Sequence, residues 1–457
     1  MEPADRRIIL DVSGVIRWLG PPVGIVRSEH ALARFALQNR PDIVLSVFDP
    51  SIDRFCRVNP AWARRLLAWD HAFDTVAFRA RGTRRGLAKL RPTRYSLTMA
   101  LERLRLTSGP ALRRILDMVQ RALWRPRRLP YPFTDKRDKR NCVVPLSWAI
   151  GSPLDLGPGD TILSVGSDWY FKPTDSIGPL KRRYGFRYAV MCYDLIPILY
   201  PSFFPERDLE LFKRHWSAMM SVADLVLVSS RSVESDVRAY CASLGIAAPR
   251  LALTPLGCEP VTAGPEVPVP AGLQGGKFIL FVATIEPRKG HAMLLDIWQQ
   301  LLSEGLPQRL GFKLVFVGRP GWHVDDLLAR IANRMAFEGT VLHLTDLDDR
   351  ALARLYETAA FCVLPSLYEG FGLPLVEAFA RGKTVIASTG GSLPEVAGEF
   401  APCLSPDEPG AWLELIRHWM EDESLRREYE DRIRNSFVTA SWDDVAARIF
   451  KAVGELG

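Results

Sequence analysis

The stretch SLYEGFGLPLVEAF, residues 366–379, places two glutamates on either side of a glycine-rich run. Pro374 suits the first turn of a helix, because that position needs no backbone N–H hydrogen bond. The two glycines before it allow unusual backbone angles and the close approach of a ligand. A helix N-terminus presents unpaired N–H groups and the positive end of the helix dipole, which suit a phosphate. The stretch therefore predicts a phosphate cradle at a helix start, with Glu369 and Glu377 beside it as acceptors for the hydroxyl groups of a sugar nucleotide.

The two glutamates also have a purely structural interpretation, in which Glu377 complements the helix dipole and Glu369 is a solvated loop residue. Around them, apolar and β-branched runs alternate with helical spacings. The runs that we expect to be strands are 277–285, 312–318, 340–345, 361–366 and 384–388. Strands that alternate with helices imply a parallel sheet covered on both faces. Ligands of such doubly wound sheets bind beyond the carboxyl ends of the strands.

A second series of the same kind occupies the first half of the chain. The expected strands are 6–16, 42–49, 160–166, 187–196, 223–230 and 250–257, with helices at 24–37 and 207–222. Residues 258–276 are rich in proline and glycine and predict an interdomain linker. We therefore expect a Rossmann-like domain at 1–260, with a basic helical insertion at about 56–150. A second Rossmann-like domain is expected at 261–435, followed by a closing segment at 436–457.

Length and composition exclude several classes of protein. A chain of 457 residues suggests two or three domains, and 47% hydrophobic residues are enough for large cores, so global disorder is excluded. The seven cysteines include no C-x-x-C pair and the seven histidines show no H-E-x-x-H spacing, which argues against a zinc site. The chain starts directly with an expected strand, so we predict no secretory signal, and no apolar run approaches the length of a membrane span. We expect reduced thiols in a cytoplasmic setting.

Several motifs carry a family resemblance. Residues 365–382 and 384–398, with FVATIEPRKGH at 281–291 upstream, resemble the retaining nucleotide-sugar glycosyltransferases of family 4. The resemblance implies the GT-B fold, in which two Rossmann-like domains face each other across a cleft and the closing segment crosses back to the first domain. DVSGVIRWLGPPVGIVR at 11–27 and YDLIPILYPSFFP at 193–205 more narrowly resemble bacterial polysaccharide enzymes of the mannosyltransferase type.

The resemblance implies a set of donor-binding residues. Glu369 would contact the hydroxyl groups of the donor sugar, and Glu377 would hold those of the ribose. The backbone N–H groups of Phe371, Gly372 and Leu373 would meet the diphosphate. The chemistry agrees, because charge-assisted hydrogen bonds to a carboxylate are about twice as strong as neutral ones.

Two cations and a glycine complete this set. Arg288 and Lys289 lie where a loop enters a helix, so both can reach a diphosphate at the cleft, although such a pair is more often solvated surface. Many relatives place an arginine near the end of the preceding strand, where this chain has Ala283 and Thr284, so Arg288 is a candidate to replace that charge. Gly24, just before an expected helix, corresponds to a glycine-bearing loop close to the donor phosphate and the acceptor. A simple turn glycine is the alternative.

Many relatives carry a histidine near the reacting sugar, about where the strand at 187–196 ends, and this chain does not. Asp194 is there instead, and it either orients the acceptor hydroxyl group or is an ordinary turn aspartate. TDLDD at 345–349 contains a D-x-D pattern, but helix capping by Asp346 or Asp348 explains it without a metal. We therefore expect neither a metal nor a cofactor, with the nucleotide-sugar as a substrate.

The positive charge of the chain is concentrated in one segment. Residues 79–140 hold 19 lysines and arginines against four acidic residues, a net charge of +15, whereas the whole chain carries +7. A solvated basic surface is one interpretation and a nucleic-acid surface is another, but no helix-turn-helix, zinc-finger or RNP signature accompanies the segment. Residues 111–125 combine an apolar stripe with basic flanks and a tryptophan, as interfacial helices do. We therefore predict that 79–140 contacts an anionic inner-membrane surface and no nucleic acid.

The residues and the resemblance together predict a retaining hexosyltransferase. The narrower resemblance makes mannose from GDP-mannose the first candidate donor. It also implies a polyprenyl-diphosphate-linked saccharide as acceptor, in the synthesis of O-antigen, capsule or exopolysaccharide. We expect the enzyme in the cytoplasm or on the cytoplasmic face of the inner membrane. The alternatives are another GT-B enzyme, such as a nucleotide-sugar epimerase or a transferase with a soluble acceptor, and a non-catalytic protein that binds sugar nucleotides.

Overall fold

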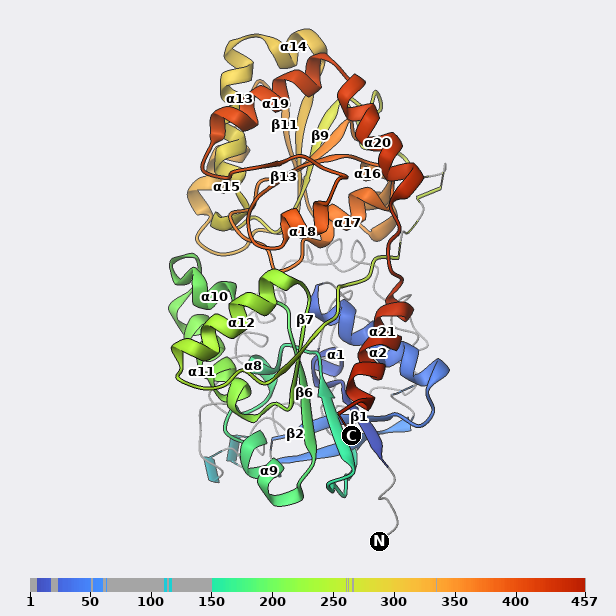
Figure 1. Ribbon diagram of the computed structural model, residues 1–457. Helices are drawn as coiled ribbons and strands as arrows, with labels where there is room; N and C mark the ends of the chain where they lie inside the picture. Colours follow the sequence, from blue (N-terminus) through green and yellow to red (C-terminus); the bar gives the residue numbers. More distant parts are fainter. Residues whose placement is uncertain are drawn as a thin grey trace, which may run out of the picture.

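The chain folds into two α/β parts, each built on its own sheet and stacked one above the other (Figure 1). The computed structural model describes residues 6–17, 24–50, 52–60, 63, 111–112, 115–116, 150–259, 261, 263–264, 267–333 and 335–456. Nearly all of the predicted membrane contact at 79–140, and most of the insertion predicted at about 56–150, lie outside the described residues. None of the described helices is long and apolar enough to cross a membrane. We call the part built on the first sheet the N-terminal domain and the part built on the second the C-terminal domain.

The N-terminal sheet has eight strands among the described residues, in the order β4-β3-β2-β1-β5-β6-β7-β8. They are β1 (Arg7–Asp11), β2 (Val44–Asp49), β3 (Arg54–Val58), β4 (Ile150–Pro153), β5 (Asp160–Ser164), β6 (Arg187–Cys192), β7 (Leu225–Val228) and β8 (Arg250–Leu253). Neighbours are parallel from β2 to β8, but β3 and β4 pair antiparallel. The strands predicted for this half are all parallel, and the two antiparallel edge strands β3 and β4 were not predicted. The connection from β2 to β3 is too short for the crossover that a parallel pair requires.

Helices cover both faces of this sheet and bury two hydrophobic cores. They are α1 (Ser13–Arg17), α2 (Ile25–Asn39), α8 (Asp168–Phe171), α9 (Ile177–Tyr184), α10 (Ile196–Leu199), η2 (Pro201–Phe203), α11 (Glu206–Val222), α12 (Arg231–Ser243) and α21 (Trp442–Gly454). Helices α2 and α21 lie side by side on one face, and α11 and α12 contribute to the core on the other (Figure 1). The predicted helices at 24–37 and 207–222 are thus confirmed as α2 and α11.

The first strand is shorter than predicted. The expected strand ran over 6–16, whereas β1 ends at Asp11 and α1 begins at Ser13. The carboxylate of Asp11 accepts hydrogen bonds from the N–H group of Ser13, at 3.2 Å, and from its hydroxyl group, at 2.6 Å. Asp11 also forms an ion pair with the buried Lys172. This side-chain hydrogen bonding competes with the strand and turns the chain into α1.

The C-terminal sheet is parallel throughout the described residues, in the order β11-β10-β9-β12-β13-β14. Its strands are β9 (Phe278–Val282), β10 (Lys313–Val317), β11 (Val341–Leu344), β12 (Phe361–Leu364), β13 (Val385–Ser388) and β14 (Cys403–Leu404). Its helices are η3 (Pro287–Lys289), α13 (His291–Ser303), α14 (Leu306–Leu310), α15 (Asp325–Ala332), α16 (Asp349–Thr358), α17 (Leu373–Phe379), α18 (Leu393–Ala397), α19 (Pro409–Glu421) and α20 (Ser424–Ser436). Each of the five strands predicted for this half is present, and one hydrophobic core encloses the sheet.

The chain passes between the two domains twice, in the segments 254–277 and 437–441 (Figure 1). The two crossings touch, because the backbone N–H group of Cys258 donates a 3.0 Å hydrogen bond to the carbonyl oxygen of Ala440. After the second crossing, α21 buries its apolar face in the N-terminal core, where the ring of Phe450 stacks on that of Phe35 with centroids 6.0 Å apart. The end of the described chain therefore belongs to the hydrophobic core of the domain in which the chain begins.

Candidate functional site

The glycine-rich loop before α17 projects from the C-terminal domain onto the N-terminal domain. The helix begins at Leu373 with Pro374 in its first turn, as the sequence predicted. Gly372, which precedes it, has a φ of 93°, a left-handed value that favours glycine. The side chains of Phe371 and Leu373 pack against the hydrophobic core of the N-terminal domain. The loop is therefore held by both domains, and a diphosphate-binding role for its backbone N–H groups stays a prediction.

Gly370 marks the closest approach of this loop to the other domain. A Cβ atom at this position would lie 2.3 Å from the carbonyl oxygen of Tyr193 and 2.7 Å from the Cβ atom of Asp194. Both neighbours belong to the segment that follows β6. The contact of Gly370 with the N-terminal domain leaves no room for a side chain, so it requires glycine. It also places the neighbouring Glu369 at the boundary between the domains.

Glu369 is buried among groups that stabilise its negative charge, so a solvated loop glutamate is excluded. Its carboxylate accepts hydrogen bonds from the Nζ atom of Lys289 at 2.5 Å, the Nη1 atom of Arg288 at 3.2 Å and the hydroxyl group of Ser366 at 2.7 Å. Burial alone would raise the pKa of Glu369, but the two cations outweigh it and hold the pKa at about 2. Glu369 is therefore an ionised acceptor in a fixed position.

Arg288 and Lys289 lie together in η3, at the carboxyl end of β9, so the surface interpretation of this pair is wrong. Arg288 also donates to the carbonyl oxygen of Tyr368 at 2.7 Å and to the carboxylate of Glu286 at 3.1 Å. Burial lowers the pKa of Lys289, and the positive charge of Arg288 lowers it further. The pKa of Arg288 is raised, because Glu369 and Glu286 outweigh its burial. The cations Arg288 and Lys289 thus alternate with the carboxylates of Glu286 and Glu369 in one buried cluster. The sequence analysis missed Glu286.

Glu377, on α17, connects the C-terminal domain to α2 of the N-terminal domain. Its carboxylate accepts a hydrogen bond of 3.2 Å from the hydroxyl group of Tyr356 and lies 3.5 Å from the Nη1 atom of Arg27. Burial raises its pKa, although Arg27 and Arg381 oppose this shift. Arg27 also pairs with Asp349 at 3.2 Å. Arg27 therefore bridges the two domains, a role that the sequence analysis did not assign to it.

Asp194 follows β6 and lies near Arg288 and Glu369. Its Oδ1 atom accepts a 3.0 Å hydrogen bond from the N–H group of Ile196, which makes it a turn residue in part. Burial raises its pKa, against the attraction of Arg288. Gly24 is the N-cap of α2 with a φ of 52°, directly before Ile25, which reaches the cavity described next. The proposed roles of Asp194 toward an acceptor and of Gly24 toward a phosphate stay predictions.

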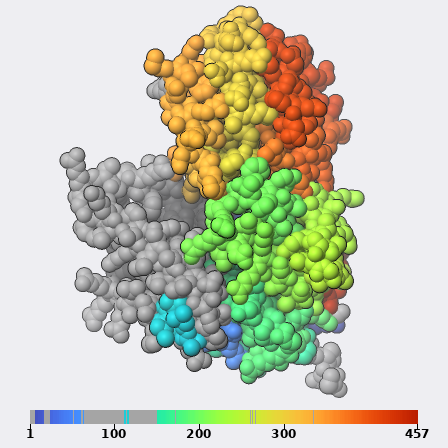
Figure 2. Space-filling view, turned by 90° about the vertical axis from the view of Figure 1, so that its left-hand side faces the viewer, coloured from blue at the N-terminus to red at the C-terminus, as the bar shows by residue number. Residues whose placement is uncertain are grey.

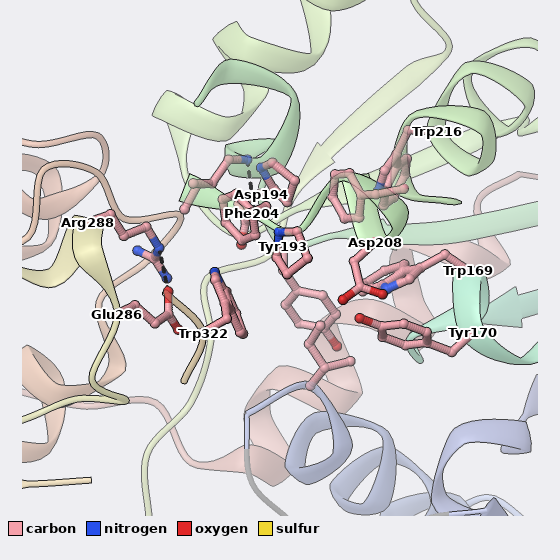
Figure 3. Close-up of a pocket in the computed structure, with 15 residues that line it drawn as sticks. Trp169, Tyr170, Tyr193, Asp194, Phe204, Asp208, Trp216, Glu286, Arg288 and Trp322 are labelled. Atoms are coloured by element: carbon pink, nitrogen blue, oxygen red, sulfur yellow. Dashed lines mark hydrogen bonds and ion pairs between the residues drawn. The ribbon is translucent and has the colours of Figure 1, made fainter. Parts of the chain in front are cut away.

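A cavity of about 190 Å³ lies between the two domains beside these residues. The N-terminal domain supplies the aromatic rings of Trp169 and Tyr170 from α8 and the carboxylate of Asp208 from α11. The C-terminal domain supplies Arg288 and Trp322. Trp322 and Arg288 lie on one side of the cavity and Trp169 and Tyr170 on the other (Figure 3). None of the three aromatic residues was singled out from the sequence, because their approach depends on how the domains meet.

The described residues contain no cluster of three or more His, Cys, Asp or Glu side chains that could hold a metal ion. Asp348 of the D-x-D pattern is the N-cap of α16, and its side chain accepts a 2.7 Å hydrogen bond from the N–H group of Ala351, as capping predicted. His215 is buried beside Trp169 and Trp216, and burial lowers its pKa to about 4. It is a neutral core residue.

The chain is similar to several known proteins. Residues 269–436 match the family described as Glycosyl transferases group 1. The O-antigen chain mannosyltransferase B of Escherichia coli is 28% identical over 57% of this chain and 68% of its own length. The serotype-specific mannosyltransferase WbdA of Escherichia coli and the MMP alpha-(1->4)-mannosyltransferase of Mycolicibacterium hassiacum are each 28% identical over 50% of this chain. The chain spans only 29% and 53% of the length of these two relatives.

The fold has a relative that covers the whole chain. The Anabaena protein HepE, solved in complex with UDP, superposes with a TM-score of 0.54 over 98% of this chain and 100% of its own, at 15% identity. Likeness at that identity concerns the fold, and it extends over both domains. The family match covers the C-terminal domain, in which Glu369, Arg288 and Lys289 meet. The C-terminal domain therefore matches the group 1 glycosyltransferases over residues 269–436, and the two domains together have the GT-B fold.

Proposed function

We propose that this glycosyltransferase moves a hexose from a nucleotide-sugar to a polyprenyl-diphosphate-linked saccharide, with retention of the anomeric configuration. Mannose from GDP-mannose is the first candidate, because the three relatives named above are mannosyltransferases. The proposed transfer would be a step in the synthesis of a bacterial surface polysaccharide. The observation that carries the proposal is the buried cluster of Glu369, Lys289 and Arg288 at the interdomain boundary.

The cluster can perform the two tasks that transfer from a nucleotide-sugar requires. The carboxylate of Glu369 can accept hydrogen bonds from hydroxyl groups of the donor sugar, while Arg288 and Lys289 neutralise the charge that develops on the leaving diphosphate. In the retaining reaction, the bond between the anomeric carbon and the phosphate oxygen breaks on the face where the acceptor oxygen attaches. The departing diphosphate takes the acceptor proton. Stabilisation of such developing charge is usually the largest catalytic effect.

We also propose functional units at 1–260, 261–435 and 436–457. The first would present the acceptor, the second would hold the nucleotide-sugar through residues that include Glu377, and the third would return to the first domain. The packing of α21 on the N-terminal core supports this division. Membrane contact through the basic segment 79–140 is part of the proposal, and it rests on the charge of that segment and on the amphipathic pattern of residues 111–125.

Calorimetric titration of GDP-, UDP- and dTDP-sugars, with EDTA present, tests the donor site. We expect one nucleotide class to bind the wild-type protein. Glu369→Gln should reduce the transfer rate about a hundredfold or more, because it removes the charge that holds two buried cations. Glu428→Gln is the matched control, since Glu428 is exposed. Thermal melts of both variants separate loss of function from loss of fold.

Two results would contradict the proposal. One is a failure of every nucleotide-sugar to bind. The other is a Glu369→Gln variant that is folded and transfers sugar at the rate of the Glu428→Gln control.

A further inference from the structure

We propose that the interdomain cavity beside Arg288 binds one uncharged pyranose ring of the acceptor, held between aromatic side chains of both domains. This inference rests on the proposed transferase function and identifies the class of sugar that the enzyme extends. The occupant would be a neutral hexose unit, and the charged diphosphate of a lipid carrier would lie outside the cavity.

The aromatic walls suit the face of a sugar ring. Trp169 lies edge-on to Phe212 at 5.0 Å, and Trp322 lies tilted against Phe204 at 5.4 Å, so the orientation of both indoles is fixed by packing. Both tryptophans are half-buried and line the cavity from opposite sides (Figure 3). The electron-rich face of an aromatic ring attracts groups of positive partial charge, such as the C–H bonds of a pyranose. A tryptophan on each side can therefore cover a single ring.

The polar groups of the cavity favour a neutral sugar over an anionic one. Asp194, Asp208 and Glu286 bring three carboxylates to its wall, against the single cation of Arg288. Arg288 is already hydrogen-bonded to Glu286 and Glu369. Carboxylates accept hydrogen bonds from sugar hydroxyl groups but repel the carboxylate of a uronic acid. We therefore expect the cavity to bind a neutral sugar more tightly than a uronic acid.

The size of the cavity limits the occupant to one ring. Its volume of about 190 Å³ is below the roughly 300–1,000 Å³ of pockets for drug-sized ligands. Arg288 is the link to the donor site, since it lines the cavity and also contacts Glu369. A sugar in the cavity would thus lie beside the cluster that we assign to the donor, which is where an acceptor hydroxyl group must be.

The cavity exists only while the domains are in contact. The Nε1 atom of Trp322 donates a 2.5 Å hydrogen bond to the carbonyl oxygen of Phe203, which joins the C-terminal domain to the N-terminal η2. Trp322 therefore has two separable parts, a ring that can cover a sugar and an N–H group that connects the domains. Trp322→Phe keeps an aromatic ring and removes the N–H group, whereas Trp322→Ala removes both.

The test measures binding of methyl α-glycosides of mannose, glucose, galactose, N-acetylglucosamine and glucuronic acid, by saturation-transfer NMR and calorimetry with GDP present. We expect at least one neutral glycoside to bind, and the glucuronide to bind at least about tenfold more weakly. Trp169→Ala and Trp322→Ala should each weaken that binding about tenfold, and Trp322→Phe should retain most of it. Leu199→Ala is the control, because Leu199 is exposed on the neighbouring α10 and does not line the cavity.

The outcomes separate this inference from the transferase proposal. If nucleotides bind but no neutral glycoside does, or if the glucuronide binds equally well, the cavity assignment is overturned and the donor site stands. An unchanged affinity in Trp322→Ala, or an equal loss in Trp322→Phe and Trp322→Ala, also overturns it, because the ring would then not contact the sugar. If glycosides bind as expected and no nucleotide binds, the sugar site is supported and the transferase function fails.

Discussion

The hydroxyl group of Ser230 donates a 2.9 Å hydrogen bond to the carbonyl oxygen of Gly370. The hydroxyl group of Ser229 donates to the same oxygen at 3.0 Å. Both serines follow β7 of the N-terminal domain, and Gly370 is next to Glu369 in the loop of the C-terminal domain. The position of the proposed donor-binding carboxylate therefore depends on the opposite domain. Figure 2 shows the surfaces of the two domains in contact.

Gly370→Ala should separate donor binding from transfer. The added methyl group would meet the backbone of Tyr193, so the loop could not take its place against the N-terminal domain. Because misplacement of about 1 Å can cost a hundredfold in rate, we expect transfer to fall about that much. Nucleotide-sugar affinity, measured by calorimetry, should change only a few-fold. The control is Gly275→Ala, where a Cβ atom would meet nothing within 4 Å. Equal transfer rates for the two variants would contradict the role of this contact.

Lys289→Met should make donor affinity depend on pH. In the wild-type protein the pKa of Glu369 is about 2, so its carboxylate stays ionised from pH 5 to 8. Without Lys289 the burial of Glu369 is opposed only by Arg288 and the hydroxyl group of Ser366, and its pKa rises. Protonation would then weaken donor binding as the pH falls toward 5. Calorimetric titrations at several pH values measure this slope. The exposed Lys451→Met is the control, and equal slopes in the two variants would rule out the coupling.

Glu29→Gln should stabilise the protein at alkaline pH. Glu29 is buried on α2, and burial raises its pKa to about 8, with Asp11 and Asp168 adding to the shift. A carboxyl group whose folded pKa is raised contributes stability below its unfolded pKa, about 4.5, and that stability is lost as the pH rises through 8. The slope is at most about 1.4 kcal/mol per pH unit. The N–H group of Gly14 donates to Oε1 at 2.9 Å, and the amide oxygen of glutamine can accept the same bond.

Urea unfolding of the wild type and of Glu29→Gln at pH 5, 6.5 and 8 provides the measurement. The two proteins should differ little at pH 5, and the variant should be the more stable at pH 8. If the free energies of unfolding of the two proteins changed in parallel across this pH range, Glu29 would be ionised in the folded protein.

Asp348→Ala should reduce stability without affecting metal dependence. The variant removes the N-cap of α16, which typically costs about 1 kcal/mol. Asp348→Asn keeps a capping oxygen, so its melting temperature should stay near that of the wild type. Thermal melts and transfer assays with and without EDTA test both points. A loss of activity in Asp348→Asn that added divalent metal reverses would favour a metal site instead.

The parts of the fold that local patterns determine could be predicted. Strand β12 is a short apolar run, and the start of α17 at Leu373 agrees with the fixed φ angle of Pro374 in its first turn. Contacts between distant segments could not be predicted, because no local pattern records which side chains the two domains bring together. Trp322 reaches Phe203, and Arg27 reaches Glu377, only through the way that the domains pack.

The same limit explains the error at the first strand. Asp11 ends β1 because its carboxylate is needed beside Lys172, which is far away in the sequence and buried in the same core. The apolar and β-branched residues of 6–16 favoured a longer strand, but the interactions of the buried Asp11 carboxylate end the strand at that residue.

The hydrogen bond between Cys258 and Ala440 has a consequence for how the enzyme can open. Two chain segments that cross side by side and are hydrogen-bonded to each other oppose sliding and twisting of the domains more than a single tether would. When the loop at Gly370 leaves the N-terminal domain, the two crossings keep the domains close together. The effective concentration of one domain at the other therefore remains high, and reclosure is an intramolecular step. Ligands would then enter by a swing about the Cys258–Ala440 pair, and the released product would leave along the same arc.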